Sequence, residues 1–424
     1  MLVEFSVANF RSFAERQTIS LVAGAASRRD LRFSAPTGNR AAPEVLRVAA
    51  IFGPNNSGKS AFVRALHFFK SFVRESAKES QANDEIEVKP FKFDSILVQQ
   101  PSEFEVIFIT NGNQYQYGFR ADARRVHEEW LFHMTRGPGQ KTQRWFTRLY
   151  DPDSGEYEWY INPSVRGQKE VWRESTRDNA LFLSTAIQLK AEHFQETFDW
   201  ISDKLRVVPA NNRISSDYTQ KICTDDDSKI KVLSFLQAAD TRISDILIEE
   251  SEFNESMIPS VLPESLREEL TKDLRGKTIR KLMTGHKTAN GVIYLELSEE
   301  SDGTQVLFAL AGPWLDTLKT GKTLIIDELS NSLHPLVVGT LVEAFHNLDT
   351  NTGNAQLLFT GHETYVMDPR KMHRDEIYFL EKNESDATRI IPLSDFKPRG
   401  NEMFERGYLH GRYGGIPQVT SIES

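Results

Sequence analysis

The feature that most constrains this chain is the glycine-rich stretch GPNNSGKS at residues 53–60. An apolar run, LRVAAIF, precedes it and a helical pattern follows it, which is the order of strand, loop and helix that a phosphate-binding loop requires. Glycines at both ends let the backbone turn its N–H groups inward, and the start of the helix presents its positive dipole end to the same point. The stretch therefore predicts a nucleotide-binding loop at the end of a buried strand.

The residue types in this loop suit the parts of a nucleoside triphosphate. The Lys59 ammonium would neutralise the β and γ phosphates, and the Ser60 hydroxyl would ligate Mg²⁺. We therefore expect ATP and Mg²⁺ as the cofactors. The loop residues expected to bind the nucleotide are Gly53, Pro54, Asn55, Asn56, Ser57, Gly58, Lys59, Ser60 and Ala61.

The segments around this loop predict an α/β protein. Apolar residues recur at helical spacing after the loop, so one helix face can pack on a sheet. These residues are Phe62, Ala65, Leu66, Phe69 and Val73. The opening residues alternate as in a first strand, and two alternating runs surround Asn111-Gly112, a strong hairpin signal. Aromatic strand-like pieces extend this antiparallel sheet to about residue 160.

Length and composition describe a large globular chain. At 424 residues it exceeds one ordinary core, so a second lobe or a large insertion is expected. No apolar run approaches the roughly 20 residues of a membrane span, which predicts a protein of the cytoplasm without membrane contact. The single cysteine, Cys223, excludes an intrachain disulfide. A net charge of −9 gives no global signal of nucleic-acid binding.

The chain is expected to divide into three parts. Residues 1–160 would form the N-terminal part of an ATPase head, with the phosphate loop and the antiparallel sheet. Residues 161–290 read as a compact, mainly helical insertion, and residues 291–424 would complete the head. The acidic run around Asp225 is interpreted as a helix start or loop.

The run TLIIDE at residues 323–328 predicts a buried strand that ends in two carboxylates. Asp327 would hold Mg²⁺ opposite Ser60, and Glu328 would polarise the water that attacks the γ-phosphate. A second buried run, QLLFTGHE, ends at His362, whose imidazole would hydrogen-bond the γ-phosphate or the attacking water. We predict Glu328, His362 and Lys59 as the catalytic residues.

With these motifs in order, the chain resembles the ABC-type ATPases of the SMC, RecF and OLD kind. It is most similar to the AbiL and RloA-like branch of bacterial abortive-infection and anti-phage systems. The resemblance rests on NFRSF at residues 9–13, ESDGT, DELSNSLHP, AQLLFTGHE, RDEIYFLEK and the terminal YLHGRYGGIP. It departs from the family pattern in reading TGH where TTH is expected, and in lacking the double glycine of the transporter signature.

The resemblance assigns further roles. It implies that Arg11 lies by the nucleotide and that SLHP is the loop after the acidic strand that ABC-type ATPases share. Ser301, Gly303 and Thr304, at the start of a helical pattern, would complete the site of a second subunit by contacting its γ-phosphate. This implies a homodimer or higher homo-oligomer built around ATP. The glutamine of the family's Q-loop stays open among Gln99, Gln100 and Gln114.

Three functions remain open at this stage. The resemblance favours a sensor or regulatory ATPase of an anti-phage system, with DNA or a phage component as a further partner class. About sixty residues follow His362, fewer than an ordinary domain, so a separate chain is expected to supply the nuclease or toxin. The alternatives are a RecF-like DNA maintenance ATPase and an ATP-bound scaffold or antitoxin with little turnover. Within the terminal block, Tyr408, Arg412 and Tyr413 suit either a partner surface or packing of a sheet edge.

Overall fold

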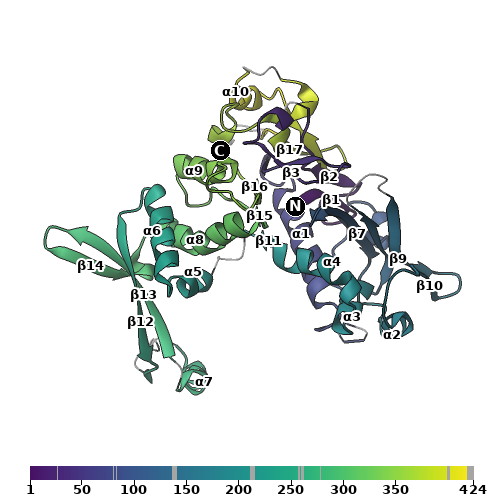
Figure 1. The fold of residues 1–424 in the computed structure, drawn as a ribbon, viewed down its shortest axis with the longest axis horizontal. Helices are drawn as coiled ribbons and strands as arrows, with labels where there is room; N and C mark the ends of the chain where they lie inside the picture. The colour runs from purple at the N-terminus through teal and green to yellow at the C-terminus, as the bar shows by residue number, and fades with distance from the viewer. Residues whose placement is uncertain are drawn as a thin grey trace, which may run out of the picture. The chain divides into compact units, whose positions relative to one another are not determined.

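The computed structural model describes residues 1–25, 27–79, 81–82, 84–135, 141–210, 215–255, 258, 262–276, 278–398 and 402–417. The chain forms two compact units, each treated by itself below (Figure 1). The first unit consists of Met1–Asn212 and Thr317–Ser424, and the second of Arg213–Asp316. Within the described residues, no helix is long and apolar enough to cross a membrane.

An antiparallel sheet of seven described strands forms one layer of the first unit. Its order is β10 (Glu156–Ile161), β9 (Thr142–Asp151), β8 (Val126–Met134), β7 (Asn113–Ala121), β6 (Ser102–Thr110), β1 (Leu2–Ala8) and β2 (Gln17–Ser20). The predicted hairpin is confirmed as β6–β7, with Asn111 and Gly112 at φ 50° and 79° in the two-residue turn. Such a turn needs positive φ at both positions, which is why Asn-Gly is a strong signal.

A second sheet of six described strands is mainly parallel. Its order is β11 (Leu205–Val208), β15 (Thr323–Ile326), β16 (Gln356–Thr360), β5 (Val48–Phe52), β17 (Ile377–Lys382) and β18 (Thr388–Pro392). Only β18 runs antiparallel to its neighbour. Strands β5, β15 and β16 are buried along their whole length, which explains why they read as continuous apolar runs. A small pair, β3 (Ser34–Pro36) and β4 (Glu44–Leu46), completes the described strands of this unit.

The phosphate-loop helix α1 (Lys59–Glu75) packs into the core that both sheets share. Phe62 meets Phe5 of β1 edge to face at 5.6 Å, and Phe69 stacks on Phe119 of β7 at 5.6 Å. Ile51 of β5 belongs to the same cluster. All five apolar positions predicted for this helix face are fully buried, so the amphipathic reading is confirmed. The remaining helices of this unit are α2 (Lys169–Glu174), α3 (Phe182–Gln188), α4 (Gln195–Asp199), α9 (Pro335–His346) and α10 (Phe404–Leu409).

The second unit combines helices with a small sheet. Its helices are α5 (Asp217–Ile222), α6 (Asp226–Ala238), α7 (Glu264–Leu274) and most of α8 (Asp302–Thr320). The antiparallel sheet has the order β12 (Ile243–Glu252), β13 (Thr278–Thr288) and β14 (Gly291–Glu296). Asp225 caps α6 by accepting a hydrogen bond from the Ser228 N–H at 2.9 Å, so the acidic run is a helix start.

The mainly helical character expected for residues 161–290 is wrong for β12 and β13. The isoleucine-rich segment ISDILIEESE pairs with β13 along its whole length, with one register shift near its start. Cross-strand pairing on a half-buried surface decides such segments, and short periodicity alone does not reveal it. Residues 161–210 belong to the first unit, where they supply α2, α3, α4 and β11.

Candidate nucleotide-binding site

The glycine-rich loop joins β5 to α1 and lies tightly against the next two strands. A Cβ on Gly53, at φ 154°, would come within 2.4 Å of the Leu380 carbonyl oxygen on β17. A Cβ on Gly58, at φ 107°, would come within 2.3 Å of the Thr388 hydroxyl on β18. Both positions therefore require glycine for conformation and for space.

Residues that are far apart in the sequence contact the backbone of the loop and each other. The Thr388 hydroxyl lies 2.8 Å from the Ser57 carbonyl oxygen and 2.9 Å from the Ser12 hydroxyl. The Thr388 N–H also donates to the Ser12 carbonyl at 2.7 Å. Because Thr388 and Ser57 are buried, these bonds fix the backbone of the loop.

Lys59 lies buried under the loop. Its ammonium donates to the carbonyl oxygens of Gly53 at 2.7 Å and Pro54 at 3.0 Å. Burial lowers the pKa of Lys59, and the charges of Glu328 and Asp327 oppose that shift. The charges of both carboxylates therefore act on the Lys59 amine.

Two carboxylates follow β15 at the same sheet edge. Asp327 is buried, and the Thr360 hydroxyl at the end of β16 donates to its Oδ1 at 2.6 Å. The Glu328 N–H donates to the same hydroxyl at 2.8 Å. Glu328 adopts φ 57°, a left-handed conformation that is uncommon outside glycine and recurs at functional sites. Thr360 thereby orients both acidic residues.

His362 lies two residues beyond Thr360, close to Lys59 and Glu328. Burial lowers the pKa of His362, the positive charge of Lys59 lowers it further, and Glu328 opposes the shift. These influences favour the neutral imidazole, which can donate one hydrogen bond and accept another.

Sheet topology explains why these residues meet. Strands β15, β16 and β5 are parallel neighbours, with Ile326 beside Phe359 and Thr360 beside Ile51. Their carboxyl ends therefore open at one edge, where ligands of α/β sheets commonly bind. The loop with Lys59 and Ser60, the two carboxylates and His362 gather at this edge.

The candidate residues from the family resemblance lie in two places. Arg11 belongs to the first unit, in the turn whose Ser12 contacts Thr388. Burial lowers the pKa of Arg11, and the nearby positive charge of Arg64 on α1 lowers it further. Within the described residues its buried Nε has no hydrogen-bond partner.

The other three belong to the second unit. Ser301, Gly303 and Thr304 lie at the start of α8, where the Thr304 N–H donates to the Ser301 hydroxyl at 3.2 Å. This is a local N-terminal cap of the kind that serine provides. The three glutamines left open by the sequence lie in different places. Gln99 and Gln100 line a loop cavity, and Gln114 lies within β7.

Sequence reasoning missed Thr360, Thr388 and Ser12. Thr360 is visible in the sequence as the one hydroxyl at the end of the apolar run QLLF, next to His362. Its role needs the strand order, because only the adjacency of β15 and β16 puts it beside Asp327. Thr388 and Ser12 lie 376 residues apart and carry no local signal.

The residues present fit a magnesium ion. Oδ2 of Asp327 is buried and has no hydrogen-bond partner in the part of the chain that the structure describes. Burying such an oxygen without compensation is costly, and Mg²⁺ prefers oxygen ligands of this kind. Ser60, second residue of α1, supplies a hydroxyl at the start of the same helix.

The fold and this site define the class of P-loop ATPase domains. Residues 48–368 match the family model described as "AAA domain, putative AbiEii toxin, Type IV TA system". The match covers more than half of the chain, and the chain belongs to this family.

Solved structures with weak similarity include SMC head domains. One is the SMC head domain from Thermotoga maritima, with 14% identity, a TM-score of 0.40, and coverage of 92% of this chain and 98% of that chain. Another is the Smc head domain from Pyrococcus furiosus with an extended coiled coil, bound to the C-terminal domain of ScpA. It shows 10% identity, a TM-score of 0.39, and coverage of 93% and 97%. A search of curated proteins finds no match.

Proposed function

We propose that this chain binds and hydrolyses ATP at the site built by the loop, Asp327, Glu328 and His362, in the manner of an ABC-type ATPase. The observation that carries the proposal is the buried Oδ2 of Asp327, which has no hydrogen-bond partner within the described residues, together with the charge of Asp327 acting on Lys59 of the loop. A purely structural aspartate would have its oxygens satisfied by the protein. An oxygen kept free beside a phosphate loop suits metal–nucleotide chemistry.

In this proposal each side chain has a defined task. The loop N–H groups and Lys59 bind the β and γ phosphates and offset their charge. Glu328, held in its left-handed conformation, accepts the proton of the attacking water. His362, neutral because of burial and Lys59, donates a hydrogen bond to the γ-phosphate. When bound between Ser60 and Asp327, Mg²⁺ supplies further charge neutralisation at the phosphate oxygens.

The start of α8 is proposed to serve a second copy of the chain. The Ser301 and Thr304 hydroxyls, with the N–H groups of this helix start, suit an anionic γ-phosphate. ATP would then bind between two chains, and a homodimer is the expected active form. Arg11 is proposed to contact the nucleotide in its own chain.

The biological role is proposed to be regulation of a toxic effector in an anti-phage system in the cytoplasm. The family description, which names a toxin and a type IV toxin–antitoxin system, supports a defence role. The AbiL and RloA-like placement, the separate effector nuclease or toxin, and the infection trigger are parts of the same proposal.

Substitution of loop glycines tests nucleotide binding. Gly58→Ala should abolish ATP binding, because a Cβ would displace the loop from Thr388. Gly155→Ala is the matched control: Gly155 also has positive φ, 73°, but no atom lies within 4 Å of the place that its Cβ would take. Isothermal titration with ATP should show loss of ATP binding in Gly58→Ala and normal binding in Gly155→Ala. Equal affinity for ATP in both variants would contradict the proposed site.

The division of labour needs a separate assay. The purified chain should leave DNA and RNA intact, while its combination with the product of the neighbouring gene should cause nuclease activity or growth arrest on phage challenge. Nuclease activity of the isolated chain that persists in Lys59→Ala would refute a separate effector.

A further inference from the structure

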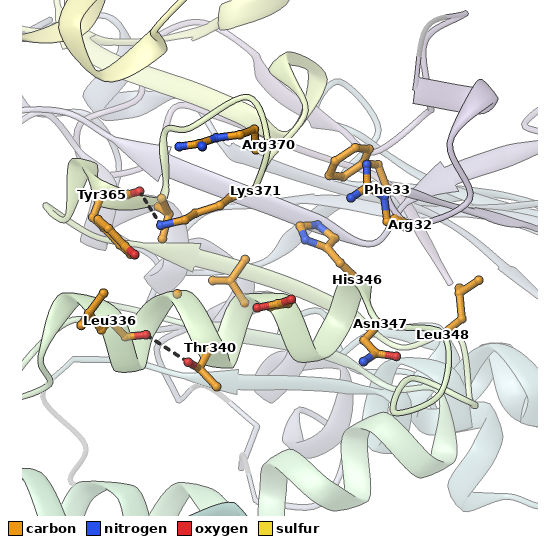
Figure 2. Close-up of a pocket in the computed structure, with 14 residues that line it drawn as sticks. Arg32, Phe33, Leu336, Thr340, His346, Asn347, Leu348, Tyr365, Arg370 and Lys371 are labelled. Carbon is orange, nitrogen blue, oxygen red and sulfur yellow. Dashed lines mark hydrogen bonds between the residues drawn. The ribbon is translucent and has the colours of Figure 1, made fainter. Parts of the chain in front are cut away.

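A second pocket of the first unit lies between α9 and the segment that follows His362. It encloses about 510 Å³. One side of α9 lines the pocket, and Tyr365, Val366, Arg370 and Lys371 line the opposite side (Figure 2). Arg32 and Phe33 close the end near His346. A volume of this size lies within the range of small-molecule sites.

Three cationic side chains line this pocket, together with one carboxylate. The cations are Arg32, Arg370 and Lys371, and the carboxylate is Glu343. Lys371 lies 2.9 Å from the ring centroid of Tyr365, which also lines the pocket. The lining therefore carries an excess of positive charge.

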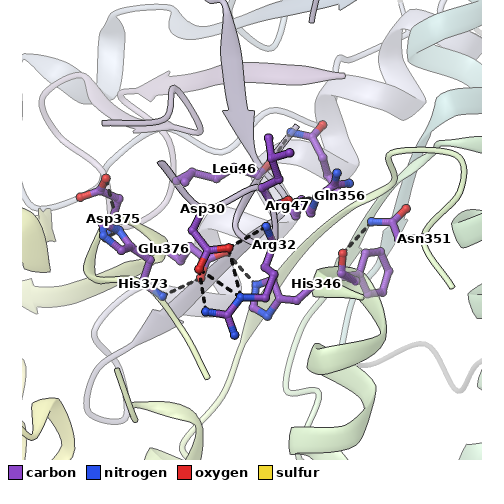
Figure 3. A network of polar contacts seen from close by, with 12 residues as sticks. Asp30, Arg32, Leu46, Arg47, His346, Asn351, Gln356, His373, Asp375 and Glu376 are labelled. Atoms are coloured by element: carbon purple, nitrogen blue, oxygen red, sulfur yellow. Dashed lines mark hydrogen bonds and ion pairs between the residues drawn. The ribbon is translucent and has the colours of Figure 1, made fainter. Parts of the chain in front are cut away.

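Each of the two arginines pairs with a carboxylate that does not itself line the pocket. Asp30 accepts from Nε of Arg32 at 3.0 Å and from its Nη2 at 2.6 Å (Figure 3). Asp368 does the same for Arg370, at 3.2 Å from Nε and 2.5 Å from Nη2. Within the described residues, Nη1 of each arginine has no hydrogen-bond partner. Each guanidinium, on a largely exposed side chain, thus pairs with one carboxylate and keeps donors for another anion.

At the end of the pocket near His346, two buried aromatic rings form part of the lining, those of Phe33 and His346. Nε2 of His346 pairs with the fully buried Glu376 at 2.8 Å (Figure 3). The His346 ring meets Phe33 edge to face at 5.1 Å. Val342 and Val366 contribute apolar lining between the ends. A planar ring can pack against such a wall while its charged group reaches the cations.

We propose that this pocket binds a small organic anion, no larger than a nucleoside monophosphate, with a planar ring and a phosphate or carboxylate group. Lys371 and Arg370 receive the anionic group. Glu343 on α9 and Asn347, the residue after this helix, hydrogen-bond polar atoms of the ring system. Such a site differs from the phosphate loop in its residues and in its ligand, which is smaller than a triphosphate.

The position of the pocket makes it a regulatory site, and this half of the inference rests on the proposed ATPase function. Helix α9 begins at Pro335, the last residue of SLHP, and the short helix η7 (Thr364–Val366) begins two residues after His362. The two elements pack closely, since a Cβ on Gly339 of α9 would lie 3.2 Å from the Tyr365 ring. A ligand that contacts both elements favours one distance between α9 and the segment that contains His362. Because His362 belongs to the proposed catalytic site, the ligand changes ATP turnover.

Binding is tested in the Lys59→Ala variant, so that the phosphate loop does not contribute. Isothermal titration uses AMP, nicotinate, adenosine and inorganic phosphate, which separate the phosphate, the carboxylate and the ring. AMP or nicotinate should bind more tightly than adenosine or phosphate. Adding Arg370→Gln and Lys371→Gln should weaken this binding by about 10- to 100-fold, the loss expected for charge-assisted hydrogen bonds. Lys371→Gln alone serves if the double change impairs folding.

Arg166→Gln is the matched control, because Arg166 is exposed and lies outside the pocket lining. The site would be overturned if neither AMP nor nicotinate binds with a Kd below about 10 mM. It would also be overturned if adenosine binds as tightly as AMP and nicotinate, or if the pocket substitutions leave the Kd unchanged. In the wild-type chain, the bound probe should change ATP turnover by about fivefold. Unchanged turnover would overturn the regulatory half, whereas absence of any ATP hydrolysis would refute the proposed function and leave the binding result standing.

Discussion

The hydroxyl of Thr360 connects the Asp327 carboxylate with the backbone of Glu328. It donates to Asp327 and accepts from the Glu328 N–H, and it is fully buried. Thr360→Val should cost about 1–3 kcal/mol of unfolding free energy, because two buried polar groups lose their partner. It should also reduce ATP turnover, since the Asp327 carboxylate and the backbone of Glu328 lose the bonds that orient them. Thr185→Val, which removes a buried hydroxyl bond to Leu181 away from the site, should destabilise the fold but leave turnover unchanged.

His362 should titrate below the ordinary histidine pKa of 6.5, because burial and Lys59 disfavour its charged form. The imidazole is then neutral at pH 7, and ATP turnover should persist below pH 6.5 and fall only as the lowered pKa is passed. Glu328→Gln removes a charge that raises the pKa of His362, so it should lower that pKa further. NMR titration of the ring protons measures both values. A pKa at or above 6.5, or a rise in Glu328→Gln, would contradict this electrostatic picture.

At the scale of elements, α10 and the turn after it pack onto β17. Tyr408 and Tyr413 stack on Phe379 at 5.0 and 5.8 Å, and both are buried. For these two tyrosines the packing alternative is therefore correct. Tyr413→Ala should cost about 3–5 kcal/mol in denaturant unfolding, as large aromatic truncations do. Arg412→Ala, whose side chain is 57% exposed, should change stability by less than about 0.5 kcal/mol. Equal losses of unfolding free energy in Tyr413→Ala and Arg412→Ala would contradict the packing role of Tyr413.

Elements encoded by local patterns were predictable, and those set by distant pairing were not. The loop, α1 and the Asn111-Gly112 hairpin carry their signals within a few residues. Strand β16 lies between β5 and β15, an order that no local pattern contains, yet it places Thr360 and His362. Strands β12 and β13 were missed because their stability comes from pairing with each other. The candidate site residues were found by type and order, whereas their supporting hydroxyls required the fold.

At the scale of the whole molecule, we predict ATP-linked dimerisation. Glu328→Gln should keep ATP bound, and a ligand that prefers the paired state stabilises that state. This variant should sediment as a dimer at micromolar concentration with ATP and as a monomer with ADP. In the same background, Gly303→Arg places a bulky charge at the start of α8 and should prevent dimerisation. A monomer in Glu328→Gln with ATP would show that the start of α8 does not complete a partner's site.

The most direct test of the proposed ATPase activity is steady-state phosphate release from ATP with Mg²⁺. The wild-type chain should hydrolyse ATP, and Glu328→Gln should bind ATP normally while releasing phosphate about 10²- to 10⁴-fold more slowly, the loss typical of a missing general base. Glu384→Gln, at an exposed carboxylate outside the site, should match the wild type. Phosphate release by Glu328→Gln at the wild-type rate, or none from the wild-type chain, would contradict the proposal.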